Sequence, residues 1–205
     1  MRMRLRSLRL PLWGLVAVAL VLAGLLWTLH LQAPRDMALG PGVSLVKPYR
    51  MVDHRGRTID ERSFLGKPTA WFFGFTHCPD VCPTTLMTMT TLLKDLGPDA
   101  DRLNVVFVTV DPERDTQQVM AEYLTSFDPR IVALIGTTEQ LAAMAKTFYV
   151  TYSKQPLDSG GYTMDHSATV LITDRNGRLA GTLDPHDQPS AMLVKARRIV
   201  AGGDP

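Results

Sequence analysis

The feature that most limits how this chain can fold is a stretch of twenty consecutive uncharged residues near the N-terminus. Residues 10–29 read LPLWGLVAVALVLAGLLWTL, about the length that an α-helix needs to cross the hydrocarbon core of a bilayer. Residues 10–31 are therefore predicted to be a transmembrane anchor. Any water-soluble fold has to be built from the residues that follow.

The residues in front of this stretch predict its orientation. The tail, residues 1–9, contains four arginines and no acidic residue, and positively charged flanks usually stay in the cytoplasm. The rest of the chain is then expected in the periplasm, held by a single pass through a bacterial inner membrane. A cleaved signal peptide is the alternative, but its apolar core would be about 7–15 residues long.

The composition indicates that the exported part of the chain is one near-neutral globular domain. The chain has 22 basic and 20 acidic residues, and the four arginines of the tail account for its excess of positive charge. No basic surface is left to suggest a nucleic acid as partner. Two prolines and two glycines in residues 32–42 indicate a linker, so the domain is predicted to span residues 43–203.

Strands and helices are predicted to alternate along this domain. A hairpin is expected over residues 49–60, further strands over 69–75, 104–110, 131–135, 168–173 and 178–183, and helices over 83–96, 116–127, 138–148 and 189–200. Asp115 is the expected N-cap of the second helix. Such alternation is typical of an α/β sandwich with parallel central strands.

The two cysteines, Cys78 and Cys82, lie in the segment GFTHCPDVCP, between a predicted strand and a predicted helix. A helix N-terminus favours thiolate over thiol, and residues four apart lie on one face of a helix. A structural disulfide is disfavoured because so short a loop constrains the unfolded chain very little. A pair of inert buried cysteines is disfavoured by Pro79 and Asp80 between them, which suit an exposed turn.

The spacing of the cysteines favours metal binding over dithiol redox chemistry. Redox pairs on such a turn normally have two intervening residues, whereas Cys78 and Cys82 have three. Two soft thiolates favour cuprous copper, zinc or iron–sulfur, and a third ligand is needed to hold copper firmly in both of its oxidation states.

A histidine is the expected third ligand, and His166 is the best candidate. It lies in the polar segment YTMDHS that leads directly into the strand predicted at 168–173, so it should emerge at a sheet edge, where α/β folds place their sites. His77 is expected to point away from the cysteines, and His54 and His186 to be solvated. His30 adjoins the predicted anchor and is a poor candidate.

Two other groups of residues are assigned to the core or to local structure. Met89 fits the buried stripe of the helix predicted at 83–96, and Met87 is a weak candidate for a thioether ligand. The aromatic residues of the first central strand are expected to be core side chains: Trp71, Phe72, Phe73 and Phe75.

Three motifs together resemble the Sco/SenC family of copper-binding proteins: FGFTHCPDVCP at 73–83, VDPERDT at 110–116 and DHS at 165–167. The resemblance covers roughly residues 43–200. It implies a thioredoxin-like fold and one copper ion, cuprous or cupric, held by Cys78, Cys82 and His166. Asp111 matches a family aspartate near the site, for which contact with the site or with a partner is expected.

The resemblance also implies a function and partners. The protein should help to assemble cytochrome c oxidase by delivering copper to the binuclear copper site of subunit II, or by reducing the cysteines of that site. Other copper chaperones and a periplasmic thiol reductant are further expected partners, since a disulfide between Cys78 and Cys82 cannot bind metal.

Several functions stay open from the residues alone. The protein is not expected to be an enzyme, except for an ancillary thiol–disulfide reductase activity. The main rival function is that of a membrane-anchored thiol–disulfide oxidoreductase; the three-residue spacing and the lack of a proline at 165–167 stand against it. A thiol peroxidase and a purely structural membrane-tethered module are less favoured by this cysteine pattern.

Overall fold

The computed structural model describes residues 42–184 and 187–202. The predicted anchor, most of the linker, His30 and His186 lie outside these residues, so their predictions stay predictions. No helix within the described ranges is both long and apolar enough to cross a membrane.

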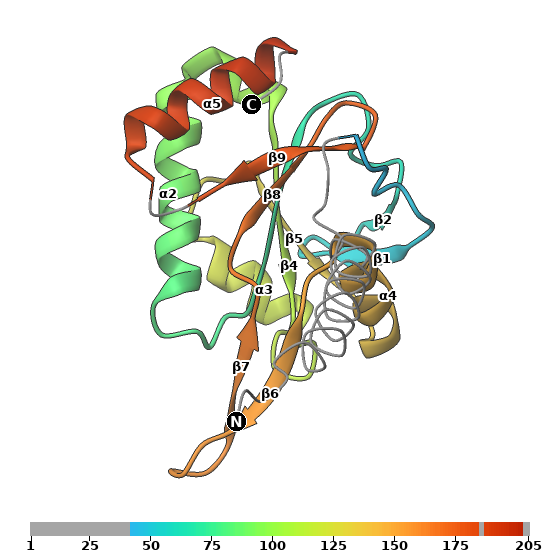
Figure 1. The fold of residues 1–205 in the computed structure, drawn as a ribbon. Coiled ribbons are helices and arrows are strands. Elements are labelled where there is room, and N and C mark those ends of the chain that lie inside the picture. Colours follow the sequence, from blue (N-terminus) through green and yellow to red (C-terminus); the bar gives the residue numbers. More distant parts are fainter. Residues whose placement is uncertain (1–41, 185–186, 203–205) are drawn as a thin grey trace, which may run out of the picture. The chain divides into compact units, whose positions relative to one another are not determined.

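Seven strands form the main sheet, in the order β2-β1-β5-β4-β3-β8-β9 (Figure 1). Their bounds are β1 Arg50–Asp53, β2 Thr58–Asp60, β3 Thr69–Gly74, β4 Asn104–Thr109, β5 Ile131–Ile135, β8 Val170–Thr173 and β9 Leu179–Leu183. The central strands β3, β4 and β5 run parallel, whereas β1 and β8 pair antiparallel with β5 and β3. The alternating pattern predicted from the sequence is present.

The helices are α2 Val81–Leu96, α3 Gln117–Leu124, α4 Thr138–Phe148 and α5 Pro189–Ala201, with a 3₁₀ helix at Gly97–Arg102. All six residues of β3 are buried, as expected for a strand covered on both faces. Trp71 and Phe73 contact Phe148 of α4. Phe72 stacks on Phe107 on the opposite face, because successive side chains of a strand point to opposite sides. The predicted core role of these aromatic residues is confirmed.

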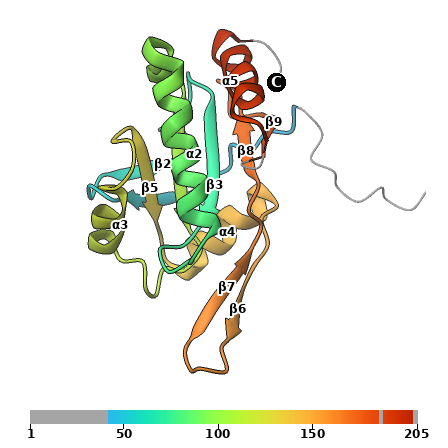
Figure 2. The same cartoon turned by 90° about the vertical axis from the view of Figure 1, so that its left-hand side faces the viewer.

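The hairpin β6 Tyr152–Pro156 and β7 Tyr162–His166 was not predicted. It forms a separate two-stranded sheet and projects from the body in both views (Figures 1 and 2). Among the ten residues of the two strands only Met164 is buried. A hairpin that buries so little needs few apolar residues, so its polar sequence did not show the pattern of a strand. The hairpin ends at His166, immediately before the connection to β8.

Asp115 is not the N-cap of α3, so that prediction was wrong. Thr116 is the cap, and its hydroxyl accepts a hydrogen bond from the Val119 amide at 3.3 Å. The Asp115 side chain is fully buried. Hydrogen bonds from Thr76 and Thr109, in two other segments, satisfy its carboxylate there. Helix α2 also begins two residues earlier than expected, at Val81, which places Cys82 within its first turn.

Candidate metal centre

The two cysteines lie at the junction between β3 and α2. Cys78 is half-buried in the loop before the helix, whereas Cys82 is fully buried in the first helical turn. Both are free thiols, and the Cys82 amide lies 3.5 Å from the Cys78 sulfur. The helix start thus turns both sulfurs toward the same side.

Gly74, the last residue of β3, provides the space for the Cys82 side chain. A Cβ atom at Gly74 would lie 2.8 Å from the Cys82 sulfur and 2.9 Å from the Phe107 ring. Both separations are shorter than ordinary van der Waals contact. Glycine is therefore required here by close packing, not by its backbone angles.

Burial raises the pKa of the Cys82 thiol far above its ordinary value. From the sequence, the helix N-terminus is expected to favour the thiolate at this turn. For Cys82, desolvation outweighs that effect, because the side chain is enclosed by core residues and removed from water. In the metal-free protein Cys82 is a thiol.

His166, the last residue of β7, brings an imidazole to the same place. Its Nε2 atom lies 3.6 Å from the Cys82 sulfur, and its Nδ1 atom lies 3.1 Å from the Ser167 carbonyl oxygen. Since a carbonyl can only accept, the neutral ring carries its proton on Nδ1 and directs the Nε2 lone pair toward the sulfur. Edge-to-face contacts with Phe72 and Phe75 fix the ring plane.

Cys78, Cys82 and His166 form a compact group of donor atoms. One ligand atom from each residue lies within 4.8 Å of the other two. In the part of the chain that the structure describes, no other group of three histidine, cysteine or acidic residues has the geometry to hold a metal ion. The structure therefore brings together the three residues selected from the sequence.

The remaining described histidines lie outside this group. His77 is exposed as expected, with Nδ1 3.1 Å from the Thr76 hydroxyl. His54 is not simply solvated, which corrects the prediction, because its Nδ1 accepts a hydrogen bond from the Ala133 amide at 3.1 Å. Burial, reinforced by nearby Arg55, lowers the His54 pKa, so this ring joins β1 to β5 as a neutral acceptor.

Of the two methionines considered, Met89 is fully buried in the core, as predicted, and Met87 is 50% exposed on α2.

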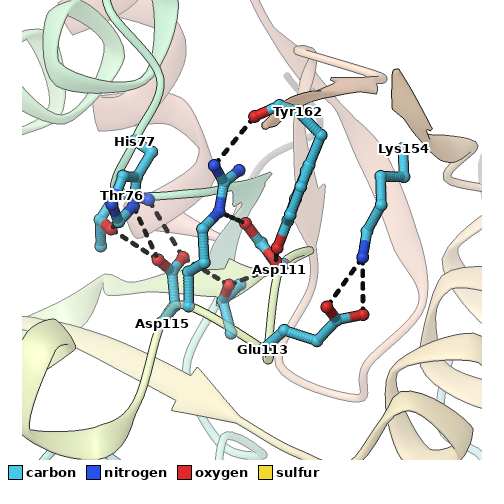
Figure 3. A network of polar contacts seen from close by, with 9 residues as sticks. Thr76, His77, Asp111, Glu113, Asp115, Lys154 and Tyr162 are labelled. Carbon is cyan, nitrogen blue, oxygen red and sulfur yellow. Dashed lines mark hydrogen bonds and ion pairs between the residues drawn. The ribbon is translucent and has the colours of Figure 1, made fainter. Parts of the chain in front are cut away.

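Asp111 lies on the loop between β4 and α3 and is 2% exposed. Its carboxylate pairs with Arg114 and accepts a hydrogen bond from the Tyr162 hydroxyl at 2.9 Å (Figure 3). It does not touch the three donor atoms. Sequence reasoning missed Arg114 and Tyr162, although Arg114 lies within the motif VDPERDT and Tyr162 lies three residues before DHS.

Residues 39–201 match the SCO1/SenC family. The chain is 37% identical over 149 residues to "Protein SCO2 homolog, mitochondrial" of Bos taurus, which covers 71% of this chain and 54% of that protein. The chain thus spans about half the length of this relative.

Two solved structures with copper bound are similar in fold. Bradyrhizobium japonicum ScoI has a TM-score of 0.71 and 39% identity, covering 78% of this chain and 99% of that one. Yeast Sco1 has a TM-score of 0.71 and 31% identity, covering 79% and 91%. The predicted α/β thioredoxin-like fold is confirmed.

Proposed function

Because this chain belongs to the SCO1/SenC family, we propose that it binds one copper ion through Cys78, Cys82 and His166 and helps to assemble cytochrome c oxidase. The observation that carries the proposal is the convergence of two sulfurs and one imidazole within 4.8 Å. The relatives with copper in their solved structures support the choice of metal.

The donor set fits copper better than other common metals. Two cysteine sulfurs and one imidazole nitrogen are soft to intermediate ligands, which suit cuprous ion and can also hold cupric ion. Atoms bound to one metal ion at about 2.0–2.3 Å lie at most about 4.6 Å apart, close to the spacing of these donors. Structural zinc sites almost always use four protein ligands, one more than this group offers.

Each of the three residues has its own part in binding the cargo. Cys82 is buried, so its thiol has to lose a proton when the metal binds. Cys78 is half-buried and gives access from the solvent. His166 is already oriented by the Ser167 carbonyl and offers its nitrogen without a change of tautomer. Three ligands leave the metal open to an incoming donor, which is what transfer to another protein requires.

The recipient we propose is the binuclear copper site of cytochrome c oxidase subunit II, either by copper delivery or by reduction of its cysteines. Residues 10–31 would anchor the protein in a bacterial inner membrane, with residues 43–203 in the periplasm. Other copper chaperones would supply the metal. A thiol reductant would keep Cys78 and Cys82 from forming a disulfide, the form that cannot bind copper.

A thiol–disulfide oxidoreductase is the second candidate. It is favoured by one observation: a half-buried Cys78 beside a fully buried Cys82, both free, the arrangement in which the accessible sulfur attacks and the buried sulfur resolves. It is opposed by the absence of a proline at residues 165–167, where the chain leads toward β8. No cis peptide bond occurs in the described ranges.

The proposed function is tested by titrating the reduced full-length chain, in detergent, with cuprous and with cupric ion. We expect one copper per chain and a thiolate-to-copper charge-transfer band in the cupric form. Cys78→Ala, Cys82→Ala and His166→Ala should each abolish the band.

Incubation of the loaded protein with copper-free subunit II should then move the copper to the recipient. Tight cupric binding by His166→Ala would contradict the three-ligand site. Efficient disulfide turnover by the copper-free protein, without copper transfer, would favour the oxidoreductase.

A further inference from the structure

The hairpin that carries His166 has few connections to the body of the molecule. Strands β6 and β7 pair only with each other, so no ladder of backbone hydrogen bonds holds them to the main sheet. Met164 is their one buried residue, and Leu157 at the tip is 45% exposed. The position of His166 therefore depends on side-chain contacts between the hairpin and the rest of the domain.

Tyr162, the first residue of β7, makes most of these contacts with the loop between β4 and α3. Its carbonyl oxygen accepts a hydrogen bond from Arg114 Nη1 at 2.9 Å, and its hydroxyl donates to Asp111 at 2.9 Å. The Arg114 guanidinium lies 3.8 Å from the centre of the Tyr162 ring, within range of a cation–π interaction. Tyr162 is thus held at both its backbone and its side chain (Figure 3).

Arg114 and Asp111 are themselves well fixed. Asp111 is almost fully buried and pairs with Arg114 Nε, and its amide donates to the Thr109 hydroxyl at 2.9 Å. The Arg114 guanidinium also lies 5.8 Å from the centre of the Phe75 ring, and Phe75 in turn contacts His166, with ring centres 5.8 Å apart. A charged group anchored by a buried partner is held in place more firmly than an exposed ion pair.

The same loop also holds the segment that carries Cys78. The fully buried Asp115 accepts hydrogen bonds from the Thr76 amide at 3.0 Å and from the Thr76 hydroxyl at 2.5 Å. The Thr109 hydroxyl donates to it as well, at 2.6 Å. Thr76 lies two residues before Cys78, so these bonds fix the path of the chain into the first cysteine (Figure 3).

We propose that residues 111–115 set the separation between His166 and the cysteines, with Asp115 fixing the segment of Cys78 and Asp111 with Arg114 fixing the hairpin of His166. The four residues Asp111, Arg114, Asp115 and Tyr162 act as positioning residues and do not touch the metal. The inference rests on the proposed function in that it treats His166 as a copper ligand. Loosening the Tyr162 side should let His166 leave while the cysteines keep their place.

Tyr162→Phe is the sharpest test, because it removes the hydroxyl that donates to Asp111 and keeps the ring against Arg114. In the reduced, metal-free full-length chain, we expect amide hydrogen exchange over 152–166 to become about five to ten times faster, as for the loss of one hydrogen bond. Exchange in α2 should stay unchanged. In the copper-loaded protein, release to excess chelator should accelerate by a similar factor.

Two further variants separate the two sides of the loop. Arg114→Lys keeps a positive charge beside Asp111 but loses the second N–H that reaches the Tyr162 carbonyl, so it should reproduce the effect of Tyr162→Phe. Thr76→Val removes one donor to Asp115; it should accelerate exchange near residues 76–82 and leave the hairpin protected.

Glu113→Gln is the matched control from the same loop. It weakens the exposed contact between Glu113 and Lys154 of β6, at 2.8 Å, and exposed ion pairs contribute little. The proposal is overturned if Tyr162→Phe and Arg114→Lys change hairpin exchange by no more than Glu113→Gln does. Normal cupric binding by His166→Ala would instead overturn the proposed function, and the exchange data would still test the anchoring of the hairpin.

Discussion

The cysteines and His166 reach the same centre from regions of very different construction. Cys82 lies on α2, packed against β3, whose residues are all buried. His166 lies at the end of a hairpin that is outside the main sheet and mostly exposed. The half of the site that carries the cysteines is therefore fixed, and we call it the fixed half. The other half, the hairpin with His166, depends on a few side-chain contacts. This division suits a protein that must both hold and release a metal.

The largest effect should come from removing Asp115, the residue that joins the loop to the fixed half. Asp115→Ala leaves the Thr76 and Thr109 donors without their buried acceptor and should lower the free energy of unfolding by about 3–5 kcal/mol. Urea denaturation of the reduced, metal-free protein measures it. Glu113→Ala, with a side chain 64% exposed, is the control, and equal losses in both variants would show that Asp115 has no special role.

The packing of the fixed half is tested by Gly74→Ala. The new methyl group would crowd the Cys82 sulfur and the Phe107 ring, so we expect a loss of about 1–3 kcal/mol in unfolding free energy and weaker cupric binding. Gly161→Ala in the hairpin is the control, because a Cβ atom there would meet no other atom within 4 Å. The only expected cost is backbone strain from the positive φ of 77°, about 1 kcal/mol of unfolding free energy. An unchanged charge-transfer band in Gly74→Ala would show that the sulfur has room to move.

Alkaline pH should destabilise the fixed half through Cys82. Burial raises the pKa of this thiol in the folded protein, so its contribution to stability is complete below the unfolded value of about 8.5. Above that pH the unfolded chain ionises first, and the unfolding free energy should fall by up to about 1.4 kcal/mol per pH unit. Denaturation of the reduced, metal-free protein at a series of pH values measures how the unfolding free energy changes with pH. Cys82→Ala should lack the contribution of this thiol, so its unfolding free energy should fall less steeply above about pH 8.5. Identical pH profiles for the two proteins would contradict the burial argument.

The smallest effect is expected at the tip of the hairpin. Leu157→Ser replaces a leucine that is 45% exposed and should change the unfolding free energy by no more than about 0.5 kcal/mol. Leu86→Ala, at a fully buried position of α2, should cost about 2–5 kcal/mol. Thermal or urea unfolding compares the pair, and a large loss for Leu157→Ser would mean that the hairpin is packed more firmly than its exposure indicates.

Sequence reasoning was strongest where burial gives a clear pattern. The apolar runs of β3, β4 and β5 and the amphipathic helices were predicted to within a few residues, because the strands are continuous runs of buried residues and each helix buries one face at helical spacing. The three donor residues could also be selected, since two cysteines four apart and a histidine before a strand are rare in a chain with few of either.

The sequence could not reveal what holds the donors at their separation. The hairpin β6–β7 is polar and shows no apolar alternation, so its strands were missed. Asp115 was assigned as a helix cap because local sequence favours that role, but its carboxylate is taken by Thr76 and Thr109 from other segments. Contacts between residues far apart in the chain, such as Arg114 with Tyr162, leave no local pattern.

X-ray absorption at the copper edge of the loaded full-length protein tests the central claim most directly. Two sulfur scatterers and at least one imidazole nitrogen are predicted for the cuprous form, with the imidazole signal lost in His166→Ala and both sulfurs retained. An unchanged imidazole signal in that variant, or a site with a single sulfur, would contradict a centre made of Cys78, Cys82 and His166.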